Sequence, residues 1–316
     1  MESATGIELD GQYRALREGA GVLAREHRRV LAIGGAEAAE YLQGQLTNDV
    51  EALEPGEGVY AALLDRKGHM QGDMRVLRTA GGFSIDTESL AGDAVLRHLS
   101  TYKIGRDVTI EEVTDQRAIL SVIGPAASEI ALGGPLARPE DGHREAQVGG
   151  VDCIVVATDL GLDLFVASAD APAVRETVLA AGAEPVGEQA AEIVRVEAGR
   201  PRFGREMTTA TIPQEAGINE RAVSFTKGCY IGQETVARLH YRGKPNRRLR
   251  GLRLSAPAEA GDSIRLAERE LGQVGTAVLS PALGPIALAI VRREAEPGAS
   301  VVVGDAVEAE VVELPF

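Results

Sequence analysis

The sequence predicts an α+β chain that is built on antiparallel sheets and ends in a small antiparallel β-barrel. Two observations lead to this fold class. In the first part of the chain, strand pairs are separated by single helices, whereas a doubly wound sheet needs strict strand–helix alternation. From about Arg247, short strand-like runs follow one another with Gly, Pro and Ser turns between them and no helical pattern. We therefore expect two domains, 1–245 and 246–316.

The first domain is expected to alternate short strands with amphipathic helices. A helical stretch opens the chain near residue 13, and the apolar spacing of Ala39, Leu42 and Leu46 on one face predicts the next helix. Residues 65–68 indicate a hairpin turn, and 132–150, rich in Gly, Pro and charge, indicates a loop. Strands are expected at 29–33, 59–64, 70–78, 83–86, 118–122, 153–158 and 163–167, and helices at 36–46, 90–99, 172–181, 192–199 and 233–241.

The second domain is expected to consist of strands alone. Its apolar runs are short and are bounded by turn residues, which is typical of a small barrel or sandwich. The expected strands are 249–254, 263–266, 272–279, 286–291, 300–303 and 306–314.

The composition indicates an acidic chain that needs no disulfide or metal to hold its fold. A hydrophobic content of 44% supports a full core, and a net charge of −14 disfavours nucleic acid and anionic membranes as partners. No signal peptide or membrane span is evident, and the two cysteines form no CxxC pair, so we expect a reducing cytoplasm. Cys153 lies in an apolar run and is expected to be a buried small residue. The five scattered histidines predict no metal site.

The most informative segment is 227–234, which reads Lys-Gly-Cys-Tyr-Ile-Gly-Gln-Glu. Cys229 is expected just ahead of a helix N-terminus and close in sequence to Lys227. Such a setting lowers the pKa of a cysteine thiol and makes it reactive. The alternative is a packing role for a small residue between two glycines.

Three further features could take part in ligand binding. Glu197 falls on the apolar face of its expected helix, so it is either in a buried ion pair or receives a fork of two N–H donors from a ligand. Asp73 lies in an expected strand. The basic run 238–250, which contains Arg238 and Arg242, is either a solvated junction or a site for carboxylates or phosphates, including those of RNA.

Together these segments resemble the YgfZ-type folate-binding family, a relative of the glycine cleavage T-protein, which is a tetrahydrofolate-dependent aminomethyltransferase. The octapeptide 227–234 matches the YgfZ signature, and Arg238 continues it. Residues 195–201 match the segment ahead of that signature, 44–49 and 61–73 resemble the N-terminal blocks, and 271–293 resembles the T-protein barrel. The T-protein has Asp-Phe where this chain has Cys229 and Tyr230.

The resemblance implies a three-subdomain folate-binding region followed by a barrel, with tetrahydrofolate as ligand. It implies that Glu197 holds the pterin ring and that Asp73 lies near the one-carbon region as a catalytic residue. It also implies a role in iron–sulfur cluster assembly or repair, with iron–sulfur proteins as partners and Cys229 as a reactive thiol. The remaining implied ligand-binding residues are Lys227, Tyr230, Gln233, Glu234, Arg238 and Arg242.

Two classes of function remain open on these residues. One is an accessory folate-binding protein for iron–sulfur clusters, and the other is an enzyme that transfers an aminomethyl or methyl group to tetrahydrofolate. The chain has no Trp to stack on a pterin, so Tyr41 and Tyr102 are candidates for that contact. A third class, a tRNA-related module, is motivated by the basic run and opposed by the overall acidity.

Overall fold

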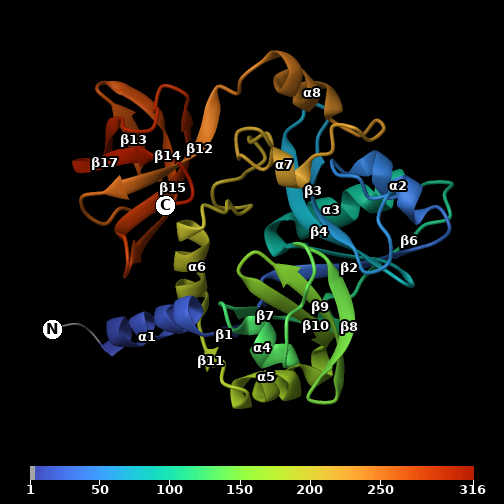
Figure 1. Ribbon diagram of the computed structural model, residues 1–316. Coiled ribbons are helices and arrows are strands. Elements are labelled where there is room, and N and C mark those ends of the chain that lie inside the picture. The colour runs from blue at the N-terminus through green and yellow to red at the C-terminus, as the bar shows by residue number, and fades with distance from the viewer. Residues whose placement is uncertain (1–3) are drawn as a thin grey trace. The chain divides into compact units, whose positions relative to one another are not determined.

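The computed structural model describes residues 4–316, and their contacts divide the chain into two compact units (Figure 1). Each unit is built from several separate segments of the sequence. The domain boundary expected near residue 245 stays a prediction. The first unit holds Met1–Leu63, Gly72–Ala191 and Thr226–Ile231, and the second holds Leu64–Gln71, Glu192–Phe225 and Gly232–Phe316.

Two mainly antiparallel sheets form the framework of the first unit. The first sheet has the order β11-β1-β7-β10-β9-β8 and the second the order β3-β4-β5-β2-β6. The strands of the first sheet are β1 (Gly21–Ala24), β7 (Arg117–Ile123), β8 (His143–Val148), β9 (Val151–Thr158), β10 (Gly161–Ala167) and β11 (Glu184–Pro185). Those of the second are β2 (Arg28–Gly34), β3 (Gly58–Leu64), β4 (Met70–Thr79), β5 (Gly82–Glu88) and β6 (Thr109–Glu112).

Helices connect these strands and continue into the second unit. Those before residue 185 are α1 (Ala4–Glu18), α2 (Ala38–Gln45), α3 (Ser89–Tyr102), α4 (Ala127–Leu132) and α5 (Ala171–Ala180). Those after it are α6 (Glu188–Glu197), α7 (Asn219–Ala222) and α8 (Gln233–Arg242).

The core of the first unit has an outer and an inner layer. In the outer layer, α4 and α5 lie on one face of the first sheet (Figure 1), where Val178 of α5 packs with Leu164 of β10. In the inner layer the two sheets meet face to face, because Leu77 of β4 belongs to the same buried cluster as Phe165 of β10. Burial of these apolar side chains is the main force that holds the layers together.

A buried ionic cluster joins the two sheets. Arg75 on β4 donates from Nε to Asp86 Oδ1 at 2.9 Å, and its Nη1 lies 2.8 Å from Asp163 Oδ2 on β10. Arg28 donates from Nε to Asp86 Oδ2 at 2.9 Å. Although burial opposes ionisation, the two guanidinium groups hold the pKa of Asp86 below its ordinary value. A fully buried carboxylate is thus kept ionised between two arginines.

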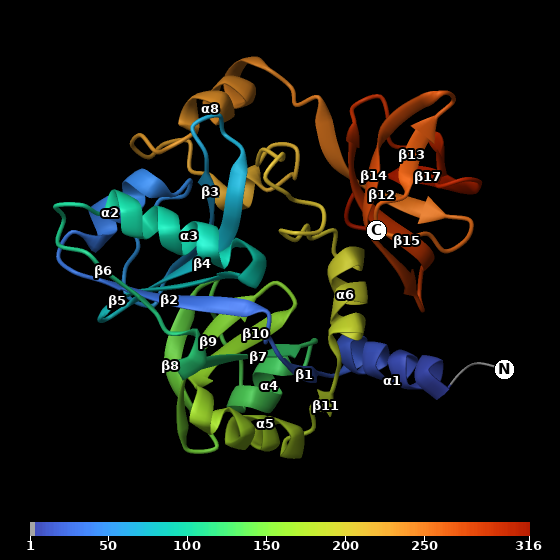
Figure 2. The ribbon, with the colours of Figure 1, turned by 180° about the vertical axis from the view of Figure 1, so that it is seen from behind.

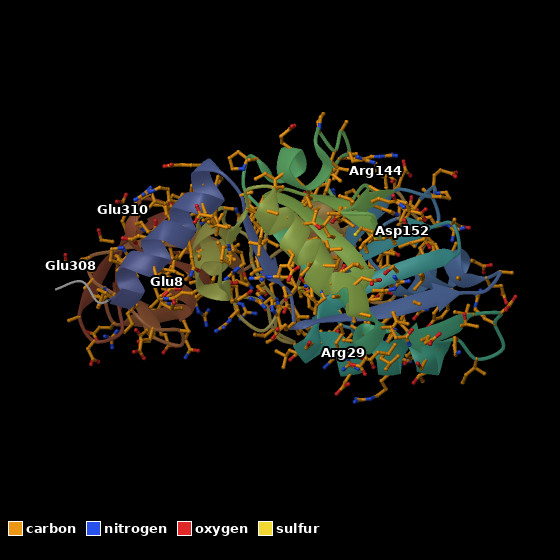
Figure 3. The ribbon with its side chains drawn as sticks, turned by 90° about the horizontal axis from the view of Figure 1, so that it is seen from below. Glu8, Arg29, Arg144, Asp152, Glu308 and Glu310 are labelled. Atoms are coloured by element: carbon orange, nitrogen blue, oxygen red, sulfur yellow. The ribbon has the colours of Figure 1, made fainter. Side chains whose placement is uncertain are left out.

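A closed antiparallel barrel makes up most of the second unit, with the order β12-β15-β14-β13-β16-β17. Its side chains alternate between the core and solvent: Ala309 and Val311 are buried, whereas Glu308 and Glu310 of the last strand are exposed (Figure 3). Every strand expected after residue 247 is confirmed, and with it the α+β fold class with a terminal barrel. The strands are β12 (Arg247–Leu254), β13 (Ser263–Leu266), β14 (Arg269–Ser280), β15 (Gly284–Arg292), β16 (Ser300–Val303) and β17 (Val307–Val312).

The C-terminal part of α6 packs against this barrel (Figure 2). Val196 lies in one buried cluster with Ile286 and Leu288 of β15. Gly199 ends the helical segment with a φ of 67°, as its position in the sequence predicts. The helix therefore holds the residue next to Val196, Glu197, at the barrel wall.

The prediction of a loop at 132–150 is wrong in part, because these residues contain β8. Gly149 and Gly150 both have positive φ and form a two-residue turn between Val148 and Val151, which pair directly. This turn type matches the twist of the flanking strands and favours a hairpin. The Gly-Gly pair was the signal that could have revealed it.

Across residues 4–316, no helix is both long and apolar enough to span a membrane.

Candidate functional site

Lys227 fixes the start of the octapeptide segment in the first unit. Its ammonium donates to the backbone carbonyls of Gln43, Leu46 and Asn48 at 2.7, 2.8 and 2.7 Å. Two of these carbonyls lie at the C-terminal end of α2, where helix carbonyls lack intrahelical partners and a cation is favourable. Burial lowers the pKa of Lys227 to about 8, so the group is still mostly charged at neutral pH. The three donors of the ammonium are matched by three acceptors.

Cys229 is exposed between two anchored residues. On one side lies Lys227 with its three hydrogen bonds, and on the other Tyr230 is buried, with its ring 5.3 Å from the Lys227 ammonium. Burial raises the pKa of Tyr230 to about 12. Cys153, by contrast, is buried as predicted, and burial raises the pKa of its thiol to about 11. The chain therefore presents one of its two thiols to solvent on a segment that is held at both ends.

Gly232 begins the helix expected after the cysteine. It is the N-cap of α8 and has a φ of 84°, a conformation that glycine adopts without strain. A Cβ at this position would lie 2.5 Å from the Asp65 backbone oxygen in the β3–β4 turn. The helix start predicted at residue 233 is confirmed, and the glycine is required by both its conformation and its close approach.

The remaining residues of the expected ligand set lie on α8 in the second unit. Glu234 in the first turn is exposed, and so are Arg238 and Arg242, four and eight residues further along the same face. Gln233 is partly buried at the helix start. In the rest of the basic run, Arg247 pairs with Glu215 at 2.9 Å and is part of the structure.

Asp73 is a buried carboxylate with one oxygen held and the other without a partner. It is 7% exposed on β4, and its Oδ2 accepts a hydrogen bond from the Tyr60 hydroxyl at 2.6 Å. Its Oδ1 is buried and has no hydrogen-bond partner among residues 4–316. Burial raises the pKa of Asp73, and the charge of Glu88 adds to this, against the Tyr60 hydrogen bond and the charge of Arg28. An unpaired buried oxygen is costly unless a ligand meets it.

Glu197 lies at the end of α6 in the second unit and is also buried, with 7% exposure. Its Oε1 accepts a hydrogen bond from the Ser280 hydroxyl of β14 at 2.5 Å, and its backbone oxygen accepts one from Phe316 N at 3.2 Å. The nearby Arg195 instead lies between Glu192 and Glu206, at 2.7 and 3.0 Å. The carboxylate is thus fixed from the barrel wall, as a binding group needs to be.

The two candidate stacking tyrosines differ in exposure. Tyr41 is a core residue, because it is 2% exposed and its hydroxyl donates to the Leu99 carbonyl at 2.6 Å. Tyr102 is 48% exposed, and its ring lies 4.6 Å from that of His98. Of the two, only Tyr102 is exposed to solvent.

Within the described residues, the expected site residues are divided between the units. Asp73, Lys227, Cys229 and Tyr230 belong to the first unit, whereas Glu197 and the residues of α8 belong to the second. No cluster of three or more His, Cys, Asp or Glu side chains that could hold a metal ion occurs in residues 4–316.

Sequence reasoning missed Tyr60 and Ser280, the groups that hold the two carboxylates. Ser280 lies 83 residues from Glu197 along the chain, and no local pattern marks it. Tyr60 is 13 residues from Asp73, and the strand–turn–strand pattern between them was the signal that could have paired them.

Two family models match the chain over almost its whole length. The GCVT N-terminal domain matches residues 8–227, and the glycine cleavage T-protein C-terminal barrel domain matches residues 247–316. This chain belongs to the glycine cleavage T-protein family. Membership in the T-protein family confirms the broader of the two resemblances, and the YgfZ type within it stays a proposal.

Individual relatives agree with this assignment. The aminomethyltransferase of Rubrobacter xylanophilus is 30% identical over 98% of this chain and 86% of its own. The tRNA-modifying protein YgfZ of Sodalis glossinidius is 31% identical over 78% of this chain and 75% of its own. The crystal structure of the glycine cleavage system aminomethyltransferase T from Bartonella henselae, 22% identical, has the same fold, with a TM-score of 0.88 over 98% of this chain and 89% of that one.

Proposed function

We propose that this chain binds tetrahydrofolate or one of its one-carbon derivatives. The observation that carries the proposal is the buried carboxyl of Asp73, which is held at Oδ2 by Tyr60 and has no partner at Oδ1. Such a group costs stability unless a ligand satisfies it, and it is typical of a binding site. Membership in a family of folate-dependent proteins supports tetrahydrofolate as that ligand.

Glu197 is proposed as the carboxylate for the pterin ring. A carboxylate matches the N–H fork of an aminopyrimidinone with two parallel hydrogen bonds, and Ser280 fixes its orientation. Hydrogen bonds to a charged group contribute about 1.5–3 kcal/mol, so Glu197→Gln should weaken tetrahydrofolate binding by roughly 10–100-fold. Calorimetric titration of wild type and variant measures this, with Glu184→Gln, on an exposed residue, as the matched control. Equal affinities for all three proteins would refute the assignment.

We propose that the folate-binding protein serves iron–sulfur cluster assembly or repair, with Cys229 as its working thiol. The support is the YgfZ-type octapeptide together with a thiol that is exposed on a segment anchored by Lys227 and Tyr230. Iron–sulfur proteins are the proposed partners. The two unpaired cysteines suit a reducing compartment, and we propose the cytoplasm.

Two measurements test the cysteine. In cells that lack the chain, wild type and Cys153→Ala should restore the activity of iron–sulfur enzymes, whereas Cys229→Ala should not. Equal complementation by both alanine variants would exclude a role for the exposed thiol. In vitro, alkylation of the folded protein should modify Cys229 before Cys153, and equal alkylation rates for the two thiols would contradict an accessible thiol at Cys229.

The second candidate is a tetrahydrofolate-dependent aminomethyl or methyl transferase. The buried Asp73 favours it, and so do the relatives that are named aminomethyltransferases. Against it stands Cys229-Tyr230, where the T-protein signature has Asp-Phe. This function predicts turnover of methylamine-type donors with tetrahydrofolate that is lost in Asp73→Asn. Absence of turnover across such donors leaves the accessory role.

The other ligand-set residues keep distinct proposed roles. The geometry of Lys227 supports a positioning role for it, because its three donors are engaged with backbone carbonyls. Tyr230 and Gln233 are proposed to border the ligand, as are Glu234, Arg238 and Arg242. We propose the exposed arginines for the glutamate tail of the folate, which predicts tighter binding of longer polyglutamates.

A further inference from the structure

A row of charged side chains crosses the second sheet beside Asp73. Arg75 of β4 pairs in register with Asp86 of β5, and Glu88 of β5 pairs with Arg28 of β2. Side chains on a strand alternate with a period of two. Asp73, two residues before Arg75, and Glu88, two residues after Asp86, therefore face the same side of the sheet and lie opposite each other.

The Glu88 side chain lies close to two basic groups. It is 8% exposed, its Oε1 accepts a hydrogen bond from Arg28 Nη1 at 3.1 Å, and His27 Nε2 lies 3.9 Å from its Oε2. Like charges directly opposite each other on a sheet are destabilising, and two neighbouring carboxylates favour a proton on one of them. Within residues 4–316, Glu88 forms an ion pair with Arg28 and Asp73 forms none, which favours the proton on Asp73.

Tyr60 decides which oxygen of Asp73 carries that proton. Its hydroxyl donates to Oδ2 at 2.6 Å, which leaves Oδ1 for the proton. Oδ1 is the buried oxygen without a partner, and a neutral O–H is less costly there than an ionised carboxylate. Burial and the charge of Glu88 both raise the pKa of Asp73, against Tyr60 and Arg28.

We infer that Glu88, held ionised by Arg28, keeps the Asp73 carboxyl protonated, so that Asp73 offers an O–H donor from Oδ1. A neutral donor selects a ligand nitrogen with a free lone pair, whereas an ionised carboxylate selects a cation. As far as the ligand is tetrahydrofolate, the inference rests on the proposed function, and it assigns Asp73 to the neutral amine form of that ligand. Glu88 and Arg28 are thus positioning residues for Asp73.

The ionisation of Asp73 can be followed directly in the ligand-free protein. With ¹³C-labelled aspartate, the Asp73 carboxyl signal, identified by its loss in Asp73→Asn, should titrate above the value of about 3.9 that is ordinary for aspartate. In Glu88→Gln the midpoint should move to lower pH. In Glu112→Gln, which removes an exposed carboxylate that pairs with Arg29 on the same sheet, it should not move. Arg29 is labelled in Figure 3. An ordinary midpoint in wild type, or equal midpoints in the two variants, would overturn the inference.

A stability measurement covers the case in which Glu88→Gln does not fold. With a raised pKa, native Asp73 retains a proton that the unfolded chain releases above pH 4 or so. The free energy of unfolding of wild type relative to Asp73→Asn should therefore fall as the pH rises from about 4 towards the native pKa. Urea unfolding of both proteins measures this, and parallel pH profiles would refute the inference. Neither of these two measurements uses folate. Failure of the protein to bind tetrahydrofolate would therefore refute the proposed function but not this inference.

Discussion

Replacing Lys227 by methionine tests whether this residue anchors the octapeptide or activates its cysteine. The substitution keeps most of the side-chain volume and removes three hydrogen bonds to the carbonyls of Gln43, Leu46 and Asn48. Buried hydrogen bonds to a charged group contribute about 1.5–3 kcal/mol each. Because Lys227 is only partly buried, about 1 kcal/mol per bond is a reasonable value, and the total is about 3 kcal/mol.

The expected result is a melting temperature lower by about 4–5 °C, since 1 kcal/mol shifts Tm by roughly 1.5 °C in a chain of this size. Calorimetry measures it, and Lys67→Met is the matched control, because Lys67 is exposed in the β3–β4 turn. If Lys227→Met has the same melting temperature as Lys67→Met but slows the alkylation of Cys229, Lys227 activates the thiol and the anchoring argument fails.

Two other substitutions test the framework of the site. Arg75→Met leaves the negative charges of Asp86 and Asp163 less compensated in the core and should destabilise the protein by about 3–5 kcal/mol. Arg78→Met, which replaces a half-buried arginine over the Phe83 ring, should destabilise it much less. Equal free energies of unfolding of the two variants in urea would contradict the role of the cluster. Gly232→Ala should lower the free energy of unfolding by about 1–3 kcal/mol or more, because Gly232 has a positive φ and a Cβ there would lie 2.5 Å from the Asp65 backbone oxygen. Gly228→Ala should leave the stability unchanged, because a Cβ there would have nothing within 4 Å. Equal Tm values for the two variants in calorimetry would contradict this.

The sequence predicted those features that local patterns encode. The barrel strands followed from apolar runs between turn residues, and the start of α8 followed from Gly232 and the apolar positions after it. The strand β8 was missed because its polar side chains, such as Arg144 and Glu145, resemble a loop, and its pairing with β9 supplies the structure.

The site was predictable in its residues but not in their partners. The carbonyls that receive the Lys227 ammonium lie 179–184 residues away along the chain. Backbone carbonyls are present at every residue, so no sequence pattern marks the ones that a side chain will reach. The ionic row beside Asp73 likewise depends on the register between β4, β5 and β2, which only the folded sheet sets.

The ionic link between Arg75 and Asp163 has a consequence for how the first unit unfolds. Because the link joins a strand of each sheet beside a buried apolar cluster, separating the sheets would expose two charged groups and an apolar face at once. Partial opening along this interface therefore has no inexpensive intermediate. The two sheets are expected to lose their amide hydrogen-exchange protection together, so that the strand carrying Asp73 is as long-lived as the rest of the core.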